Sequence, residues 1–114
     1  MTLLDFKNKL QQTPEKVEFS DTMAIIDANY EFTPTAFSNG TLYNASGENS
    51  GSCKLFAFAQ KQGFSKEETL ACFGHYYFDV VLNNPEGTDH QNIRNFIKTG
   101  FAGLTIEAEV LIEK

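Results

Sequence analysis

The sequence predicts an α+β domain whose helices pack on one side of a small antiparallel sheet. Apolar residues recur at helical spacing over most of the chain, which indicates several amphipathic helices. An Asn-Gly pair between two short apolar segments is typical of a β-hairpin, and the last residues alternate between apolar and polar, as in a half-buried strand. A length of 114 residues fits one domain, so we expect residues 1–114 to fold as a single unit.

Two helices are expected before the hairpin. The first begins at Thr2, where a hydroxyl side chain and an acid three residues later make a capping-box pattern. The second spans residues 14–29, with Pro14 at its first position and a break near Ser20. Pro34 ends the helical pattern because the residue before a proline disfavours helical backbone.

The predicted sheet contains a hairpin and a C-terminal strand. The hairpin over residues 35–43 turns at Asn39 and Gly40, which accept the positive φ angles of a type I′ turn. The alternating segment 104–112 has one apolar face to bury. We expect this strand to join the hairpin, because an isolated hairpin is barely stable in water.

Three further helices are expected between the hairpin and the last strand. The polar loop 44–52 leads into a helix that ends at Gly63. The next helix spans residues 66–83. The third begins with a capping-box pattern at Thr88 and ends at Gly100.

Composition excludes several classes of partner. Nine basic and fifteen acidic residues give a net charge of −6, which repels nucleic-acid phosphates and anionic membranes. No segment approaches the ~18 apolar residues of a membrane span, and the first residues lack the apolar core of a secretory signal, so we expect a cytoplasmic protein. Two cysteines are too few for a disulfide scaffold, and the two histidines lack metal-binding spacing. We therefore expect neither a metal nor a cofactor, and the partner is an unknown protein or small molecule.

The polar loop 44–52 is the first candidate site. Asn44, Asn49 and Ser52 offer hydrogen-bond donors and acceptors, and a shorter link would suffice to join a hairpin to a helix. With Lys54 beside them, these residues are predicted to bind a ligand in a concave site. An exposed mobile loop is the alternative interpretation.

A thiol-based catalytic site is the second candidate. Cys53 lies near a predicted helix start, where the helix dipole and Lys54 favour the nucleophilic thiolate. His75 is the candidate base, and Asp79, one helical turn further on, is placed to orient its ring. The alternative is that Cys53 packs as a small apolar residue and that His75 is a partly buried histidine bonded to Asp79.

His90 and Arg94 form the third candidate, one turn apart at the start of the last predicted helix. The helix N-terminus and Arg94 both disfavour a charged imidazole. A neutral His90 beside Arg94 would suit a carboxylate or phosphate group. The alternative is that His90 is a surface capping residue.

The chain resembles the HopJ type III effector family in two stretches, TPTAFSNGTLYNASGENSGSCKLFAFA at residues 33–59 and ACFGHYYFDVVLNNPEGTDHQNIRNFIKTGFAGL at residues 71–104. The strings FxNG, GENxGSCK and GxxHQNIRxF appear in the family's order, and FGHY stands where the family string carries one more residue. The resemblance implies a protein that a type III secretion apparatus injects into a host cell. It implies no reaction and therefore no catalytic residue.

Two classes of function follow from these observations. The first is a non-catalytic binding or interaction module, either in the cytoplasm or secreted by a type III system. The second is a thiol-dependent enzyme for acyl, amide or thioester chemistry, with Cys53 as nucleophile and His75 as base.

Overall fold

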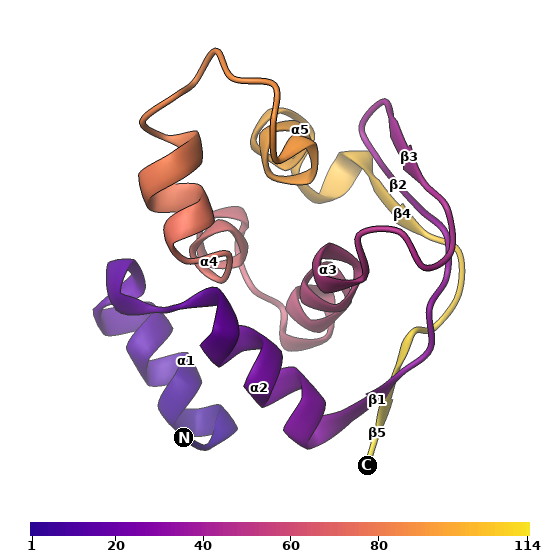
Figure 1. The fold of residues 1–114 in the computed structure, drawn as a ribbon. Coiled ribbons are helices and arrows are strands. Elements are labelled where there is room, and N and C mark those ends of the chain that lie inside the picture. Colours follow the sequence, from indigo (N-terminus) through magenta and orange to yellow (C-terminus); the bar gives the residue numbers. More distant parts are fainter.

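The structure, a computed structural model, describes residues 1–114 and confirms the predicted α+β class. Helices form one side of the molecule, and the strands run along the opposite edge (Figure 1). The helical segments are α1 (Leu3–Gln12), η1 (Pro14–Lys16), α2 (Phe19–Asn29), α3 (Ser50–Gln62), α4 (Lys66–Ala71), η2 (Tyr76–Val81), α5 (Gln91–Thr99) and η3 (Gly100–Gly103). None of these helices has the length and apolar character required to cross a bilayer.

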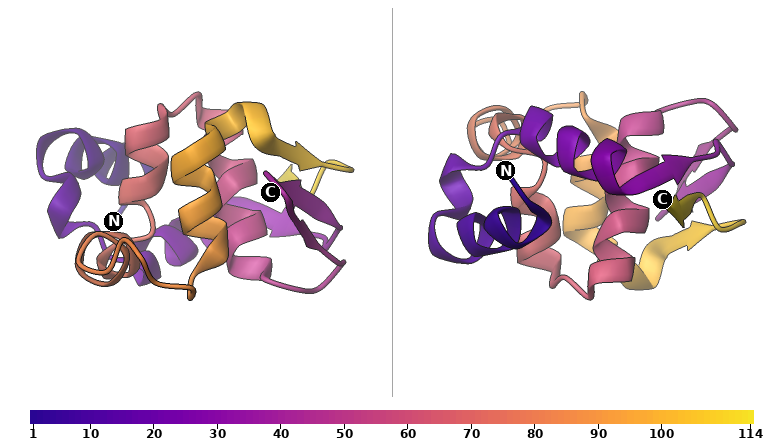
Figure 2. Two further views of the ribbon diagram at one scale, coloured as in Figure 1. Left: turned by 90° about the horizontal axis from the view of Figure 1, so that it is seen from above. Right: turned by 90° about the horizontal axis from the view of Figure 1, so that it is seen from below.

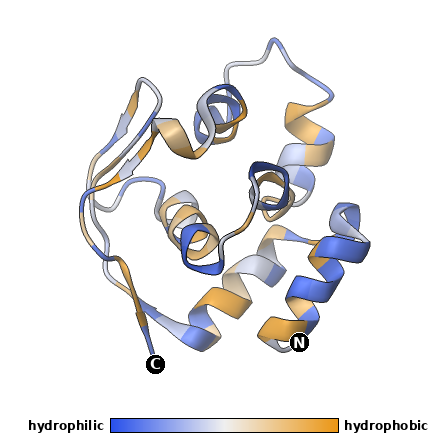
Figure 3. Cartoon of the chain, turned by 180° about the vertical axis from the view of Figure 1, so that it is seen from behind, coloured by the Kyte–Doolittle hydropathy of each residue, from blue (hydrophilic) through white to orange (hydrophobic).

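Helix α3 occupies the centre of the fold because its middle residues are nearly all apolar. Five consecutive residues at positions 55–59 are buried, and the middle of the helix is hydrophobic in Figure 3. The ring of Phe56 lies between those of Phe73 and Phe96, with centroid separations of 5.6 and 4.9 Å. Interlocking aromatic rings of this kind fix the position of α3 relative to α5.

The strands form two small antiparallel sheets. In one, β1 (Tyr30–Phe32) pairs with β5 (Leu111–Glu113). In the other, β2 (Phe37–Asn39) pairs with both β3 (Leu42–Asn44) and β4 (Leu104–Ile106), which gives the order β3–β2–β4. The residue numbers of the paired residues add to the same total in the β1–β5 and β2–β4 pairs, so the register continues across the gap. Pro34, which has no N–H to donate, lies in this gap between the sheets.

The predicted C-terminal strand is therefore correct in part. Its first residues pair with the hairpin as β4, which confirms the predicted partner. A single strand over residues 104–112 is wrong, because β5 pairs instead with β1, a strand that the sequence analysis did not predict.

The hairpin is confirmed, but its turn differs from the predicted one. Asn39 belongs to strand β2, and the two turn residues are Gly40 and Thr41. Of these two, only Gly40 has a positive φ, at 62°, whereas a type I′ turn needs two such residues. Asn39 is thereby left fully buried inside the fold rather than exposed in a turn.

Both long predicted helices are broken by contacts with distant segments. In the segment 14–29, the break predicted near Ser20 lies a few residues earlier, at the buried Val17, and it divides the segment into η1 and α2. The helix predicted over residues 66–83 divides into α4 and η2, with Gly74 at φ 63° between them. A Cβ atom on Gly74 would lie 2.7 Å from the backbone nitrogen of Phe19, so only glycine lets the two backbones approach this closely.

Replacing Gly74 with alanine is expected to lower the free energy of unfolding by about 3 kcal/mol, because strain at positive φ adds to a clash with backbone atoms. The matched control is Gly63→Ala. Gly63 has a similar φ of 69° but nothing within 4 Å of the added Cβ, so the loss there is expected to be about 1 kcal/mol. Urea unfolding measures both, and equal losses would show that the close approach at Gly74 is unimportant.

Candidate functional site

A cavity of about 480 Å³ lies beside the starts of α3 and α5. Figure 2 shows these two helices beginning on the same side of the molecule. No aspartate or glutamate lines the cavity, although the chain contains fifteen such residues. Its walls are half apolar and half polar, and they comprise Phe19, Leu42, Asn49, Ser52, Phe73, Tyr76, His90, Gln91, Asn92 and Ile93.

Both helices begin in the same unusual way. Asn49 precedes α3 at φ 51° and His90 precedes α5 at φ 49°, and these are the two non-glycine residues with positive φ. Neither side chain accepts a hydrogen bond from its own helix. The backbone N–H groups at positions 50–52 and 91–92 consequently have no acceptor within the chain.

The other α-helices have acidic side chains at their starts. The capping boxes of α1 and α4 each satisfy one first-turn N–H, and Asp21 in the first turn of α2 accepts from the N–H of Glu18. No acidic residue stands in the first turn of α3 or α5. Open N–H groups and the helix dipole make such starts attractive to negative charge, and here two of them border one cavity.

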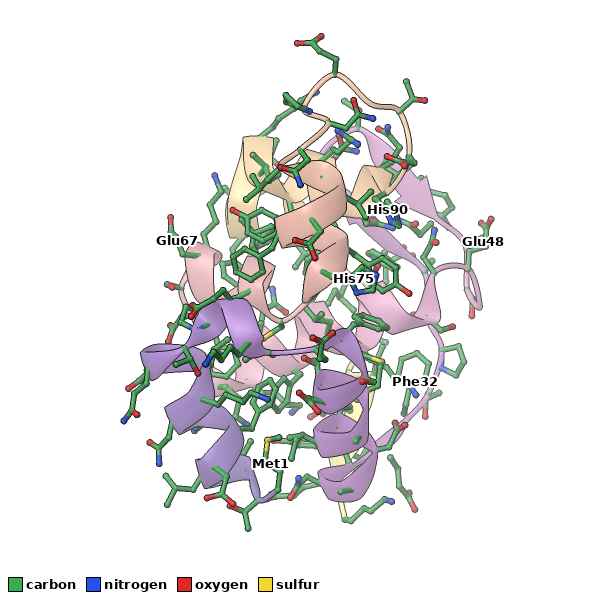
Figure 4. The ribbon with its side chains drawn as sticks, turned by 60° about the vertical axis from the view of Figure 1, so that its left-hand side comes forward. Met1, Phe32, Glu48, Glu67, His75 and His90 are labelled. Atoms are coloured by element: carbon green, nitrogen blue, oxygen red, sulfur yellow. The ribbon has the colours of Figure 1, made fainter.

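Aromatic rings form the opposite wall of the cavity. The ring of Phe19 stacks on that of Phe73 at 6.2 Å and meets the ring of Tyr76 edge-on at 5.6 Å. Tyr76 lies between the two histidines, with ring centroids 4.3 Å from His75 and 5.3 Å from His90. Both histidines face the same side of the molecule, as Figure 4 shows. The contact of Gly74 with the start of α2 is what places Tyr76 against Phe19.

Of the three loop residues predicted to bind a ligand, two lie in the cavity wall and the third is buried behind it. Asn49 and Ser52 line the cavity. Asn44 lies behind Asn49 and is buried, and its Oδ1 accepts a hydrogen bond of 2.7 Å from Asn49 Nδ2. The carboxylate of Glu48 accepts from the N–H of Ala45, and Figure 4 shows it on the outer side of the loop.

Cys53 is not placed as a nucleophile. Helix α3 begins three residues earlier than predicted, so Cys53 lies one turn inside it and its N–H already bonds to Asn49. The side chain is 1% exposed, and burial raises the pKa of the Cys53 thiol, which disfavours the thiolate. Burial likewise raises the pKa of Cys72 to about 12. The predicted activation by the helix start is therefore wrong.

The predicted His75–Asp79 pair is also not formed. Tyr76–Val81 is wound as a π-helix with His75 at its N-cap, so a spacing of four residues no longer places Asp79 directly above His75. The carboxylate facing His75 belongs to Glu18, with Nδ1 and Oε2 3.9 Å apart, and both side chains are half exposed. The structure thus assembles no set of nucleophile, base and orienting carboxylate from Cys53, His75 and Asp79.

Arg94 and Lys54 are engaged elsewhere. Arg94 is buried and donates hydrogen bonds to the backbone of Asn84 and to the carboxylate of Asp89, which holds the loop before α5. The bond from Arg94 keeps the pKa of the Asp89 carboxyl below its usual value. Lys54 pairs with Asp27 at 2.9 Å, so it does not reach the cavity.

His90 lies in the cavity wall, but the capping pattern predicted from Thr88 is wrong. The helix begins later, at Gln91, whose Nε2 donates to the carbonyl of Thr88. Sequence reasoning also missed Asn92 as a site residue. The signal for it was an amide one helical turn before Phe96, on the buried face of the helix, where a polar group needs partners.

The fold and the cavity together define a small α+β domain with a site of ligand size beside α3 and α5. A family model described as HopJ type III effector protein matches residues 3–111, and the chain belongs to this family. The crystal structure of unknown function protein VPA0580 is similar to the chain, with a TM-score of 0.97 and 52% sequence identity over 100% of this chain and 95% of that one. A comparison with curated proteins finds no match.

Alkylation tests whether either thiol is reactive. We expect native protein to react slowly with iodoacetamide at pH 7–8, because both thiols are buried and their pKa values are raised. The same reagent should label both cysteines quickly in urea, which serves as the control. Rapid labelling of native Cys53 below pH 8, located by mass spectrometry, would contradict this assignment.

Proposed function

We propose that the protein is a non-catalytic binding module that holds a small organic acid in the cavity beside α3 and α5. The observation that carries the proposal is that two helix starts without caps border the same cavity, which has no carboxylate in its wall. A volume of about 480 Å³ lies within the range of small-molecule sites.

The two halves of the wall suit the two parts of such a ligand. The acid group would accept hydrogen bonds from the open N–H groups at positions 50–52 and 91–92, and from the side chains of Ser52 and His90. The apolar part would rest on Phe19, Phe73 and Tyr76. A carboxylate or a phosphate monoester attached to a flat apolar group has this chemistry.

The negative net charge of the protein is compatible with this ligand. Long-range repulsion slows the encounter of an anion with the protein and is screened by salt. Binding itself depends on the groups within the first few ångströms, where the cavity wall contains hydrogen-bond donors and no carboxylate. We therefore expect the affinity for the organic acid to rise with ionic strength or to stay constant. Binding that depends on clustered lysines would instead weaken as salt is added.

The thiol-dependent enzyme has no supporting contact. Its nucleophile is buried and its base faces Glu18. We therefore keep the binding module as the proposed function.

The description of the HopJ family suggests a setting for this activity, namely secretion by a type III system. A cytoplasmic binding module is the alternative setting. Immunoblotting of culture supernatants from isogenic strains with and without a functional type III apparatus distinguishes them, because a secreted protein leaves the cell only in the first strain.

Titration of ¹⁵N-labelled protein with phenyl phosphate tests the proposed site. Saturable shifts are expected at the backbone amides of positions 50–52 and 91–92, because these N–H groups would donate to the phosphate. Benzyl alcohol, which keeps the ring but lacks the charge, should bind much more weakly. Shifts confined to surface lysines, or equal binding of both compounds, would contradict the proposal.

A pair of histidine variants provides the matched control. His90→Asn should weaken binding about tenfold, the cost of one hydrogen bond to a charged group, while asparagine tolerates the positive φ at this position. His75→Asn should leave the dissociation constant within about twofold, because His75 lies behind Tyr76 and outside the cavity wall. Equal losses in the two variants would remove His90 from the site.

A further inference from the structure

We propose that Asn44 is the positioning residue of the cavity, an inference that rests on the proposed function. Its side-chain amide ties the start of α3 to the start of α5 and so holds their open N–H groups at one separation. The cavity then selects ligands whose acid group is compact enough to accept hydrogen bonds from both helices at once.

The hydrogen bonds of Asn44 carry this proposal. Its Oδ1 accepts from Asn49 Nδ2 at 2.7 Å and from Asn92 Nδ2 at 3.1 Å. Asn49 directly precedes α3, and Asn92 is the second residue of α5. One buried oxygen atom therefore receives a donor from each helix start, and Asn44 itself is fixed at the end of strand β3.

Position 44 requires an amide with both a donor and an acceptor. While Oδ1 accepts from the two helices, Nδ2 donates to Asn92 Oδ1 at 3.3 Å and to the carbonyl of Phe37 at 3.4 Å. A carboxylate would bring its second oxygen against both of these acceptors. A hydroxyl group is too short to span the same four partners.

The bond between Asn44 and Asn49 explains why the start of α3 remains open. Asparagine preceding a helix commonly accepts a hydrogen bond from the first-turn N–H groups. Here the amide of Asn49 is turned toward Asn44 instead, and it caps nothing. The interaction that positions α3 thus also leaves its first-turn N–H groups available to a ligand.

Asn39 supplies a matched control within the same cluster. It is as deeply buried as Asn44 and donates from Nδ2 to the backbone and side-chain oxygens of Asn92, but it makes no bond to Asn49. Asn39→Ala therefore removes buried hydrogen bonds without separating α3 from α5. Asn44→Ala removes the bond to each helix.

The first measurement is amide hydrogen exchange in the free protein. Two backbone amides report on the first turns of the helices. In α3, the N–H of Cys53 donates to the carbonyl of Asn49. In α5, the N–H of Arg94 donates to the carbonyl of His90. Asn44→Ala should speed exchange at both amides by at least about tenfold. Asn39→Ala should do so only at Arg94. Unchanged exchange at Cys53 in Asn44→Ala would overturn the positioning role.

The second measurement is the affinity for phenyl phosphate. Asn44→Ala should weaken binding at least about tenfold and Asn39→Ala less than about twofold, although both variants melt at lower temperature. If both variants lose affinity for phenyl phosphate in proportion to their loss in melting temperature, Asn44 has a structural role only, and the proposal is overturned. Should Asn44→Ala fail to fold, Asn49→Gly deletes the link to α3 alone and keeps the positive φ, and the same loss is expected.

The two proposals fail in different ways. Wild-type protein that binds no phenyl phosphate would overturn the proposed function, together with the role of Asn44 in binding. Wild-type protein that binds it, with an Asn44→Ala variant of unchanged affinity, would overturn the role of Asn44 alone.

Discussion

The side-chain oxygen of Asn44 joins three parts of the chain that are distant in sequence. The hairpin delivers Asn44 to the interior, and Asn49 and Asn92 reach it from the starts of α3 and α5. A buried amide with partners costs little, whereas one left without partners is strongly unfavourable. The arrangement of the hairpin against the two helices therefore depends on the hydrogen bonds of Asn44 to Asn49 and Asn92, and the cavity is the space that the arrangement leaves.

The opposite wall of the cavity depends on a glycine. Gly74 lets its segment lie against the backbone at the start of α2, and the chain then turns Tyr76 onto Phe19. The asparagine cluster sets the polar side, and this backbone contact sets the aromatic side. Since neither side uses a cysteine or a carboxylate, the architecture fits binding of an organic acid better than nucleophilic chemistry.

Local signals in the sequence were enough to predict part of this structure. The capping box at Thr2 needs only neighbouring residues, and it is present as predicted. Loop polarity likewise directed attention to Asn49 and Ser52, which lie in the cavity wall. The break at Gly74 was missed because apolar periodicity continues through it, and its cause is a contact with a distant segment. Cys53 was misplaced because the first turn of α3 lies within the polar loop, which sent the thiol into the core.

A crystal structure of the protein with bound phenyl phosphate would show directly whether both helix starts hold the acid group. The phosphate group is expected to lie within about 3.2 Å of backbone nitrogens from both α3 and α5, with the phenyl ring against Phe19, Phe73 and Tyr76. A phosphate group held by one helix start alone, or by surface lysines with the cavity empty, would contradict this expectation.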